Sequence, residues 1–162
     1  MTNSSLHTRP SLATSFEATS GDGAAKGITR VLVPVDFSIC STWALRHAEE
    51  MARRFGSELI LVHVDPLMLG AELNPDRDVA IRKDLDRLVD RLRERGMTVR
   101  GVVRGGAPIE EILRAAQDQN ADLIVIGTHG RTGLSHVLIG SVAESVVRKA
   151  SCPVLAVRYE KR

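Results

Sequence analysis

The chain has 162 residues, of which 43% are hydrophobic and only 3% aromatic. A domain of this length can bury its own core, and that core must be built mainly from Val, Leu, Ile and Ala, which suits parallel strands covered by helices. The formal net charge is +2, from 22 basic and 20 acidic residues. This balance gives no reason to expect nucleic acid or an anionic membrane as a partner.

The chain is expected to be a cytoplasmic protein with one folded domain. Its apolar runs are shorter than the roughly 18 residues that cross a bilayer. Cys40 and Cys152 lie far apart, without metal-type or C-x-x-C spacing, which is typical of reduced thiols. Residues 1–27 are rich in Ser, Thr, Ala and Gly and lack the apolar core of a secretory signal, so we expect a disordered extension there and a domain over 28–162.

The hydrophobic pattern predicts five strands separated by helices. Five short runs are rich in Val, Ile and Leu and have the length of a strand. We expect these strands at 28–35, 58–64, 97–103, 121–126 and 153–158. A helical pattern lies between successive strands, and such alternation is typical of βαβ units that build a parallel sheet.

Cap and turn residues delimit the expected helices. The first has Ser38 or Ser41 as its candidate cap and Gly56 as its end. The second has Pro75 at its first position and ends at Gly96, and its outer face of Asp, Arg, Lys and Glu is expected to be solvated and to carry i,i+4 ion pairs. The last two helices are expected at 108–117 and 141–150.

A glycine-rich segment follows the strand expected at 121–126. Gly127-Thr-His-Gly130 begins directly after this apolar run, and Gly140-Ser141 precedes the last helix. Glycines let the backbone approach an anion closely, and a helix N-terminus favours negative charge. The segment therefore predicts a phosphate site, although it matches neither G-x-x-x-x-G-K-[ST] nor G-x-G-x-x-G. The alternative is a structural connection whose glycines serve turns.

The spacing Gly127-x2-Gly130-x9-Gly140-Ser141 resembles the ATP-binding signature of the universal stress protein family. The likeness covers about residues 28–159 and includes the segments V-P-V-D-F-S at 33–38, L-V-H-V at 61–64, G-x-P at 106–108 and C-P-V-L-A-V at 152–157. It implies an α/β fold with an open five-stranded parallel sheet of order 3-2-1-4-5 and helices on both faces, Rossmann-like and similar to the adenine nucleotide alpha hydrolases. Ligands of such sheets bind where the strand order reverses, here between the strands that end near Asp36 and Gly127.

The resemblance implies nucleotide-binding roles for individual residues. Asp36 would accept hydrogen bonds from the ribose, whereas its alternative role is a cap at the start of the first helix. Val64 would contact adenine through its backbone, next to Pro34 and Val35. The triphosphate would lie against the glycine segment, whose expected contacts are Gly127, Thr128, His129, Gly130, Arg131, Gly140, Ser141 and Val142.

Together these features predict an ATP-binding regulatory protein of the stress response with little or no turnover. The runner-up is a slow metal-dependent ATPase or phosphoryl-transfer enzyme. The sequence lacks an evident general base, a Walker-type lysine and a carboxylate pair, so Mg²⁺ or Mn²⁺ would be held mainly by the phosphates and water. An ATP pyrophosphatase would need Ser-Gly-Gly after the first strand, and a receiver domain would need an Asp where the third strand runs into Arg104-Gly105; neither is expected.

The resemblance further implies a homodimer that forms through the last strand. Val154, Leu155, Ala156 and Val157 make an apolar edge strand, and an exposed edge is often paired with its own two-fold mate. The expected partners are therefore an adenine nucleotide and a second copy of the chain, and neither nucleic acid nor a membrane.

Overall fold

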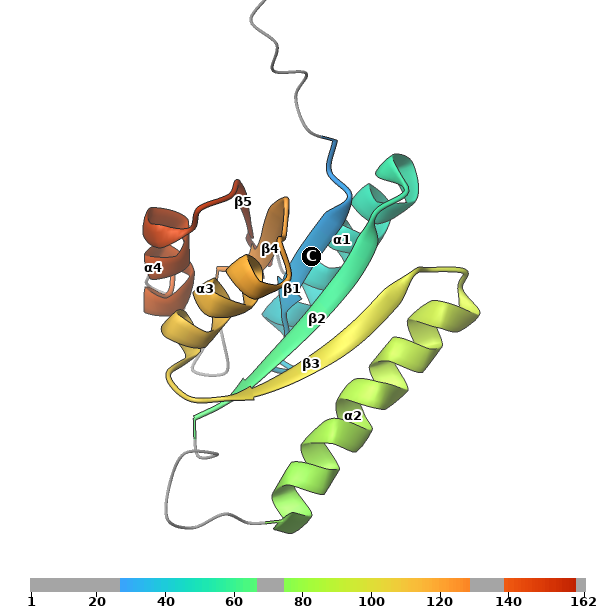
Figure 1. The fold of residues 1–162 in the computed structure, drawn as a ribbon, viewed down its shortest axis with the longest axis vertical. Helices are drawn as coiled ribbons and strands as arrows, with labels where there is room; N and C mark the ends of the chain where they lie inside the picture. Colours follow the sequence, from blue (N-terminus) through green and yellow to red (C-terminus); the bar gives the residue numbers. More distant parts are fainter. Residues whose placement is uncertain (1–26, 67–74, 129–138, 160–162) are drawn as a thin grey trace, which may run out of the picture.

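The computed structural model, which describes residues 27–66, 75–128 and 139–159, shows a sheet with helices on both faces (Figure 1). Five parallel strands form the sheet in the order β3-β2-β1-β4-β5. The predicted architecture and strand order are thereby confirmed. The strands are β1 (Arg30–Pro34), β2 (Glu58–Asp65), β3 (Val99–Gly105), β4 (Leu123–Gly127) and β5 (Val154–Val157).

Two helices cover each face of the sheet. α1 and α2 pack on one face and α3 and α4 on the other (Figure 1). Their bounds are α1 (Ile39–Phe55), α2 (Pro75–Glu94), α3 (Pro108–Asp118) and α4 (Ser141–Lys149). Of the described helices, none combines the length and the apolar character that crossing a membrane requires.

Alternate residues of each strand supply the two cores. In β1, Val31 and Val33 face α1 and α2, whereas Leu32 between them faces α3 and α4. In β4, Val125 faces α1 and α2, and Ile124 faces α3 and α4. Because both faces are covered, both sets of positions in the inner strands β1, β2 and β4 are mainly apolar, and this is why those strands show as apolar runs. The edge strand β3 also carries Arg100 and Arg104.

Four strands begin later than predicted: β1, β3 and β4 by two residues and β5 by one. For β1 and β3, the apolar residues just before the strand belong to turns. β3 was expected from Met97, but the Met97 N–H donates to the carbonyl of Leu92 at 3.1 Å and closes the turn after α2. β1 was expected from Ile28, but the Asp122 carboxylate accepts from the N–H groups of Thr29 (3.1 Å) and Arg30 (2.9 Å) and from the Thr29 hydroxyl (2.7 Å). Asp122 therefore ties the beginning of β1 to the residue that precedes β4.

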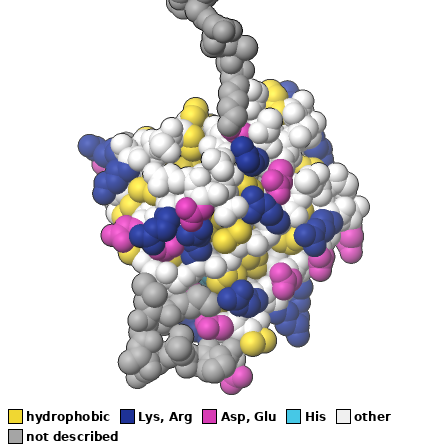
Figure 2. All heavy atoms as spheres, in the orientation of Figure 1, with side chains coloured by type: hydrophobic (Ala, Val, Ile, Leu, Met, Phe, Trp, Pro, Cys, Tyr) yellow, Lys and Arg dark blue, Asp and Glu magenta, His cyan; other side chains and the backbone are white. Residues whose placement is uncertain are grey.

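Charges of both signs are interspersed on the surface. Figure 2 shows Lys and Arg beside Asp and Glu across one face of the molecule. On α2 the ion pairs form at i,i+3, between Arg87 and Asp84 (3.1 Å) and between Arg93 and Asp90 (3.5 Å), rather than at the expected i,i+4. All four side chains are more than half exposed, so these pairs add little stability and mark a solvated face.

Leu85→Ala tests how α2 is attached to the sheet. Leu85 is 2% exposed and belongs to the core between α2 and the strands. Its truncation is expected to lower the free energy of unfolding by about 2–5 kcal/mol, measured by urea denaturation. Val79→Ala on the same helix, where the side chain is 64% exposed, is the matched control and should change stability by no more than about 0.5 kcal/mol. Equal effects would mean that Leu85 does not anchor α2.

Candidate functional site

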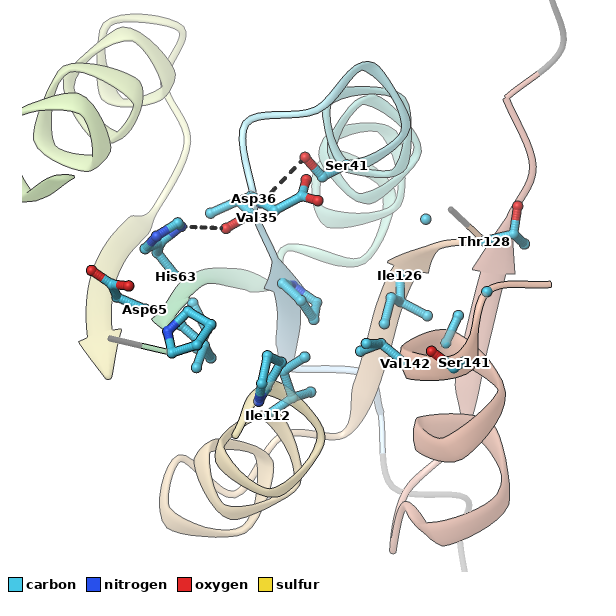
Figure 3. A pocket seen from close by; sticks show the side chains of 18 of the residues that line it. Val35, Asp36, Ser41, His63, Asp65, Ile112, Ile126, Thr128, Ser141 and Val142 are labelled. Atoms are coloured by element: carbon cyan, nitrogen blue, oxygen red, sulfur yellow. Dashed lines mark hydrogen bonds between the residues drawn. The ribbon is translucent and has the colours of Figure 1, made fainter. Parts of the chain in front are cut away.

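A cavity of about 410 Å³ opens at the carboxyl edge of the sheet. It lies where β1 and β4 meet, which is the point of reversal in strand order and the usual ligand position in such sheets. Figure 3 shows side chains from several elements converging on it. The lining residues are Pro34, Val35, Asp36, Ser41, Val62, His63, Val64, Asp65, Pro66, Arg77, Pro108, Ile112, Ile126, Gly127, Thr128, Gly140, Ser141, Val142 and Ala143.

The structure brings most of the predicted nucleotide-binding residues together around this cavity. They come from three separate parts of the chain: the end of β1, the end of β2, and the segments that flank the glycine-rich loop. These residues are Pro34, Val35, Asp36, Val64, Gly127, Thr128, Gly140, Ser141 and Val142. His129, Gly130 and Arg131 lie outside the described residues. Contact of any of them with a nucleotide stays a prediction.

The middle of the cavity is apolar. Ile112 of α3, Ile126 of β4 and Val142 of α4 lie close together between the polar groups at either end (Figure 3). Val62 and Val64 of β2 add to this wall. An apolar slot with polar groups at its ends suits a flat ring that carries hydrophilic substituents.

The end of β2 presents a backbone donor and acceptor to the cavity. The register pairs β1 with β2 as far as Pro34 and Val62, and the Val35 N–H donates to the Val62 carbonyl at 2.8 Å. Val64 lies two residues further on, so its N–H and C=O point to the same side as those of Val62. The pairing of β1 with β2 has ended there, so the N–H and C=O of Val64 face the crevice.

Asp36 and the start of α1 form one hydrogen-bonded turn. An Asp36 carboxylate oxygen accepts from the Ser38 N–H at 3.0 Å, and the Ser38 hydroxyl accepts from the Ser41 N–H at 3.2 Å. The cap of α1 is therefore Ser38. Asp36 supports this turn and also lines the cavity, so the two roles weighed for it in the sequence are compatible.

His63 is a satisfied interior residue, as its place in an apolar strand suggests. It is 5% exposed, and its Nδ1 lies 2.8 Å from the carbonyl oxygen of Val35. Phe37 stacks on the imidazole with ring centroids 4.9 Å apart. Phe37 has a φ of 63°, a left-handed conformation that is rare for an aromatic residue. The bond and the stacking fix the backbone where β1 leaves the sheet.

Thr128 and Gly140, two of the residues predicted to contact phosphate, are linked by hydrogen bonds to each other and to β5. The Thr128 N–H donates to the Val157 carbonyl at 2.9 Å, and the Gly140 N–H donates to the Thr128 carbonyl at 2.5 Å. Gly140 is the cap of α4 and makes no side-chain cap hydrogen bond. The first N–H groups of α4 are thus left without the side-chain acceptor that α1 has in Ser38, which suits them to an anion.

Gly127 has a packing role that the phosphate interpretation does not cover. A Cβ at this position would lie 2.8 Å from the carbonyl oxygen of Cys40 and 2.9 Å from its carbon. Because these atoms are backbone, a side chain here can be accommodated only if the start of α1 moves away from β4. The glycine thus sets the distance between two elements that line the cavity.

Gly127→Ala is expected to destabilise the protein by about 1–3 kcal/mol, measured by urea denaturation, because the added methyl group overpacks this contact. Gly27→Ala is the control, since a Cβ there meets nothing within 4 Å. A Gly127→Ala variant as stable as the parent would show that β4 and α1 are not in close contact.

Asp65 and Arg77 line the cavity although the sequence did not single them out. Asp65 is the last residue of β2 and is 1% exposed, and Arg77 on α2 donates to both of its carboxylate oxygens at 2.9 Å. The position of Asp65 at a strand end was a usable signal. Its pairing across twelve residues with a helix that was expected to be solvated was not visible in the pattern.

Over the parts of the chain that the structure describes, no group of three or more His, Cys, Asp or Glu side chains could hold a metal ion. A divalent cation at this cavity would therefore depend on oxygen atoms that a ligand brings with it.

The model of the universal stress protein family matches residues 27–158. The chain belongs to this family. Similar curated proteins are Universal stress protein MJ0577 of Methanocaldococcus jannaschii, 30% identical over 80% of this chain and 94% of that protein, and MJ0531 of the same organism, 35% identical over 82% and 84%.

Solved structures agree with the family assignment. That of MJ0577 superposes with a TM-score of 0.75 at 30% identity and covers 84% of this universal stress protein and 99% of that chain. A universal stress protein in complex with cAMP has a TM-score of 0.65 at 26% identity, over 82% and 98%. One from Archaeoglobus fulgidus in complex with dAMP has a TM-score of 0.63 at 27% identity, over 79% and 96%.

Proposed function

We propose that this protein binds ATP in the cavity at the carboxyl edge and acts in the cytoplasm as a nucleotide-dependent regulator of the stress response. The observation that carries the proposal is the order of groups along one cavity: a backbone edge at Val64, an apolar slot, and the N-terminus of α4. The complexes of related proteins with cAMP and dAMP support an adenine nucleotide as the ligand class.

The base would lie in the apolar slot between Val64 and Ile112. Adenine offers an amino donor next to a ring acceptor, and this pair is complementary to the C=O and N–H of a single residue. Guanine offers a carbonyl acceptor next to a ring N–H, which reverses the pattern. The Val64 backbone would thus favour adenine, and the Asp36 carboxylate would accept hydrogen bonds from ribose hydroxyls.

The phosphates would lie at the N-terminus of α4. At α1 the first N–H groups are already served by the Ser38 hydroxyl, whereas Gly140 leaves those of α4 to a ligand. Gly127, Thr128, Ser141 and Val142 line this part of the cavity. Mg²⁺ or Mn²⁺ would be held through the phosphates.

Little or no turnover is expected from this site. Both described carboxylates of the cavity are already engaged, Asp36 with the Ser38 N–H and Asp65 with the Arg77 guanidinium. Neither is arranged as a general base that would activate a water molecule. The protein is thus proposed to respond to nucleotide by binding it.

Identification of the nucleotide tests this function directly. The purified protein is denatured, and the released small molecules are identified by mass spectrometry. The emptied protein is then titrated calorimetrically with ATP and GTP, with and without Mg²⁺. Release of an adenine nucleotide, or binding of ATP that is tighter than that of GTP, supports the proposal. An emptied protein that gives no heat with ATP contradicts it.

Gly140→Val is expected to weaken ATP binding by at least about tenfold, because a branched side chain at the cap of α4 occupies the phosphate position. The Gly140 backbone, with φ −70° and ψ 153°, accepts any residue, so the fold should persist. Calorimetry measures the affinity, and Gly27→Val is the control. An unchanged affinity would mean that the phosphates do not bind at the N-terminus of α4.

The proposed assembly is a homodimer through β5. This strand is at the edge of the sheet, and its Leu155 side chain is 37% exposed. Leu155→Arg is expected to give a monomer by sedimentation at micromolar concentration, because it introduces a charge into the apolar contact. Val79→Arg, on α2 beside the opposite edge strand, is the control. A parent protein that sediments as a monomer would overturn the dimer.

A further inference from the structure

The first turns of α2 are held to the body of the protein differently from the rest of that helix. Its buried apolar residues, Leu85, Val89 and Leu92, all lie in the second half. From Asp76 to Asp84 every side chain is at least partly exposed. Hydrophobic burial therefore secures the second half of the helix much more strongly than residues 76–84.

A bidentate ion pair joins these first turns to the sheet. Arg77 Nε lies 2.9 Å from Asp65 Oδ2, and an Arg77 terminal nitrogen lies 2.9 Å from Oδ1. The Asp65 carboxylate is 1% exposed, and its backbone carbonyl accepts from the Gly106 N–H at 3.1 Å. The carboxylate is thus a fixed and desolvated anchor, for which the planar guanidinium is the matching partner.

The pair lies at the end of the cavity where the base is proposed to bind. Asp65 follows Val64 directly, and both Asp65 and Arg77 line the cavity. Beyond Arg77 lies a second hollow of about 340 Å³, which is lined by Phe37, His63, Arg77, Ala80, Ile81 and Asp84. Arg77 and His63 border both spaces. Arg77, from the first turns of α2, and His63, from β2, therefore separate the cavity from the second hollow.

We propose that Arg77 is a positioning residue of the nucleotide site, which by pairing with Asp65 holds the first turns of α2 beside the base end and so sets how slowly the nucleotide leaves. This inference rests on the proposed function. Arg77 acts through Asp65 and the placement of the helix. Its loss should affect every ligand that contains the base and should spare a ligand made of phosphate alone.

The experiment compares Arg77→Met with Arg100→Met. Arg100 on β3 pairs with Glu58 at the other end of β2 at 2.7 Å and does not line the cavity, so it is a matched ion-pair control. Dissociation rates of ATP and adenosine are measured by stopped flow with a fluorescent competitor, and inorganic triphosphate is titrated by calorimetry. Arg77→Met should raise both dissociation rates by a similar factor, about three- to thirtyfold, and leave the affinity for triphosphate unchanged.

Two further variants keep the test decisive. Arg77→Met leaves a buried carboxylate without its cation, which can prevent folding. Asp65→Asn/Arg77→Gln retains a neutral hydrogen-bonding pair and should show the same faster release if the charged, bidentate geometry is what matters. Arg77→Lys keeps the charge without the planar fork and should fall between the parent and Arg77→Met.

Hydrogen exchange supplies a readout that a purely stabilising contact would not produce. In Arg77→Met the amides of residues 78–84 should exchange faster than in the parent, whereas those of residues 85–94 should not change. ATP should slow exchange of residues 78–84 in the parent and fail to do so in the variant. A uniform increase along α2 would indicate general destabilisation and would overturn the positioning role.

The outcomes separate this inference from the function on which it rests. If the parent does not bind ATP, the proposed function fails and this inference fails with it. If the parent binds ATP and the folded variants release ATP and adenosine at the parent rate, only the role of Arg77 is overturned. An equal loss of affinity for inorganic triphosphate also overturns it, because the effect would not be confined to the base end.

Discussion

The cavity opens where the central strand has no backbone donor to offer to β4. Alternate residues of β1 face its two neighbours: the Arg30 carbonyl accepts from the residue before β4, and the Val35 N–H donates to β2. Pro34 has the same parity as Arg30, so its nitrogen faces β4, where proline has no hydrogen to donate. The register between β1 and β4 ends at Leu32 and Ile124. From there β4 diverges while β1 stays paired with β2, and the ligand space opens between them.

The polar groups of the cavity follow from this divergence. His63 contacts the carbonyl of Val35, the residue that follows β1, and the Ser38 hydroxyl caps the start of α1. The side of the cavity formed by β1 and α1 is therefore internally hydrogen-bonded. On the opposite side α4 begins with Gly140, which has no side chain to offer its first N–H groups. The cavity therefore has one side that is complete by itself and one side that an anion would complete, and this asymmetry would orient the proposed nucleotide.

Much of the fold was predictable from the sequence, because hydrophobic period and turn residues act locally. The strand order came from the resemblance, since spacing alone does not specify which strands are neighbours. Residues that line the cavity were predictable where one strand end or one glycine segment supplies them, as at Asp36 and Gly140. The pair of Asp65 and Arg77 could not be foreseen, because it forms only when α2 folds back over β2. The left-handed Phe37 is equally a product of tertiary contacts.

The Asp122 carboxylate joins β1 and β4 at their amino ends, at the edge of the sheet opposite the cavity. It binds two N–H groups and a hydroxyl at the beginning of β1 and thereby closes the gap between β1 and β4 at their amino ends. The two strands are joined there and separate at the cavity. A ligand can therefore lie between the carboxyl ends while the amino ends stay joined, and a group attached at residue 27 would be at the edge of the sheet remote from the cavity.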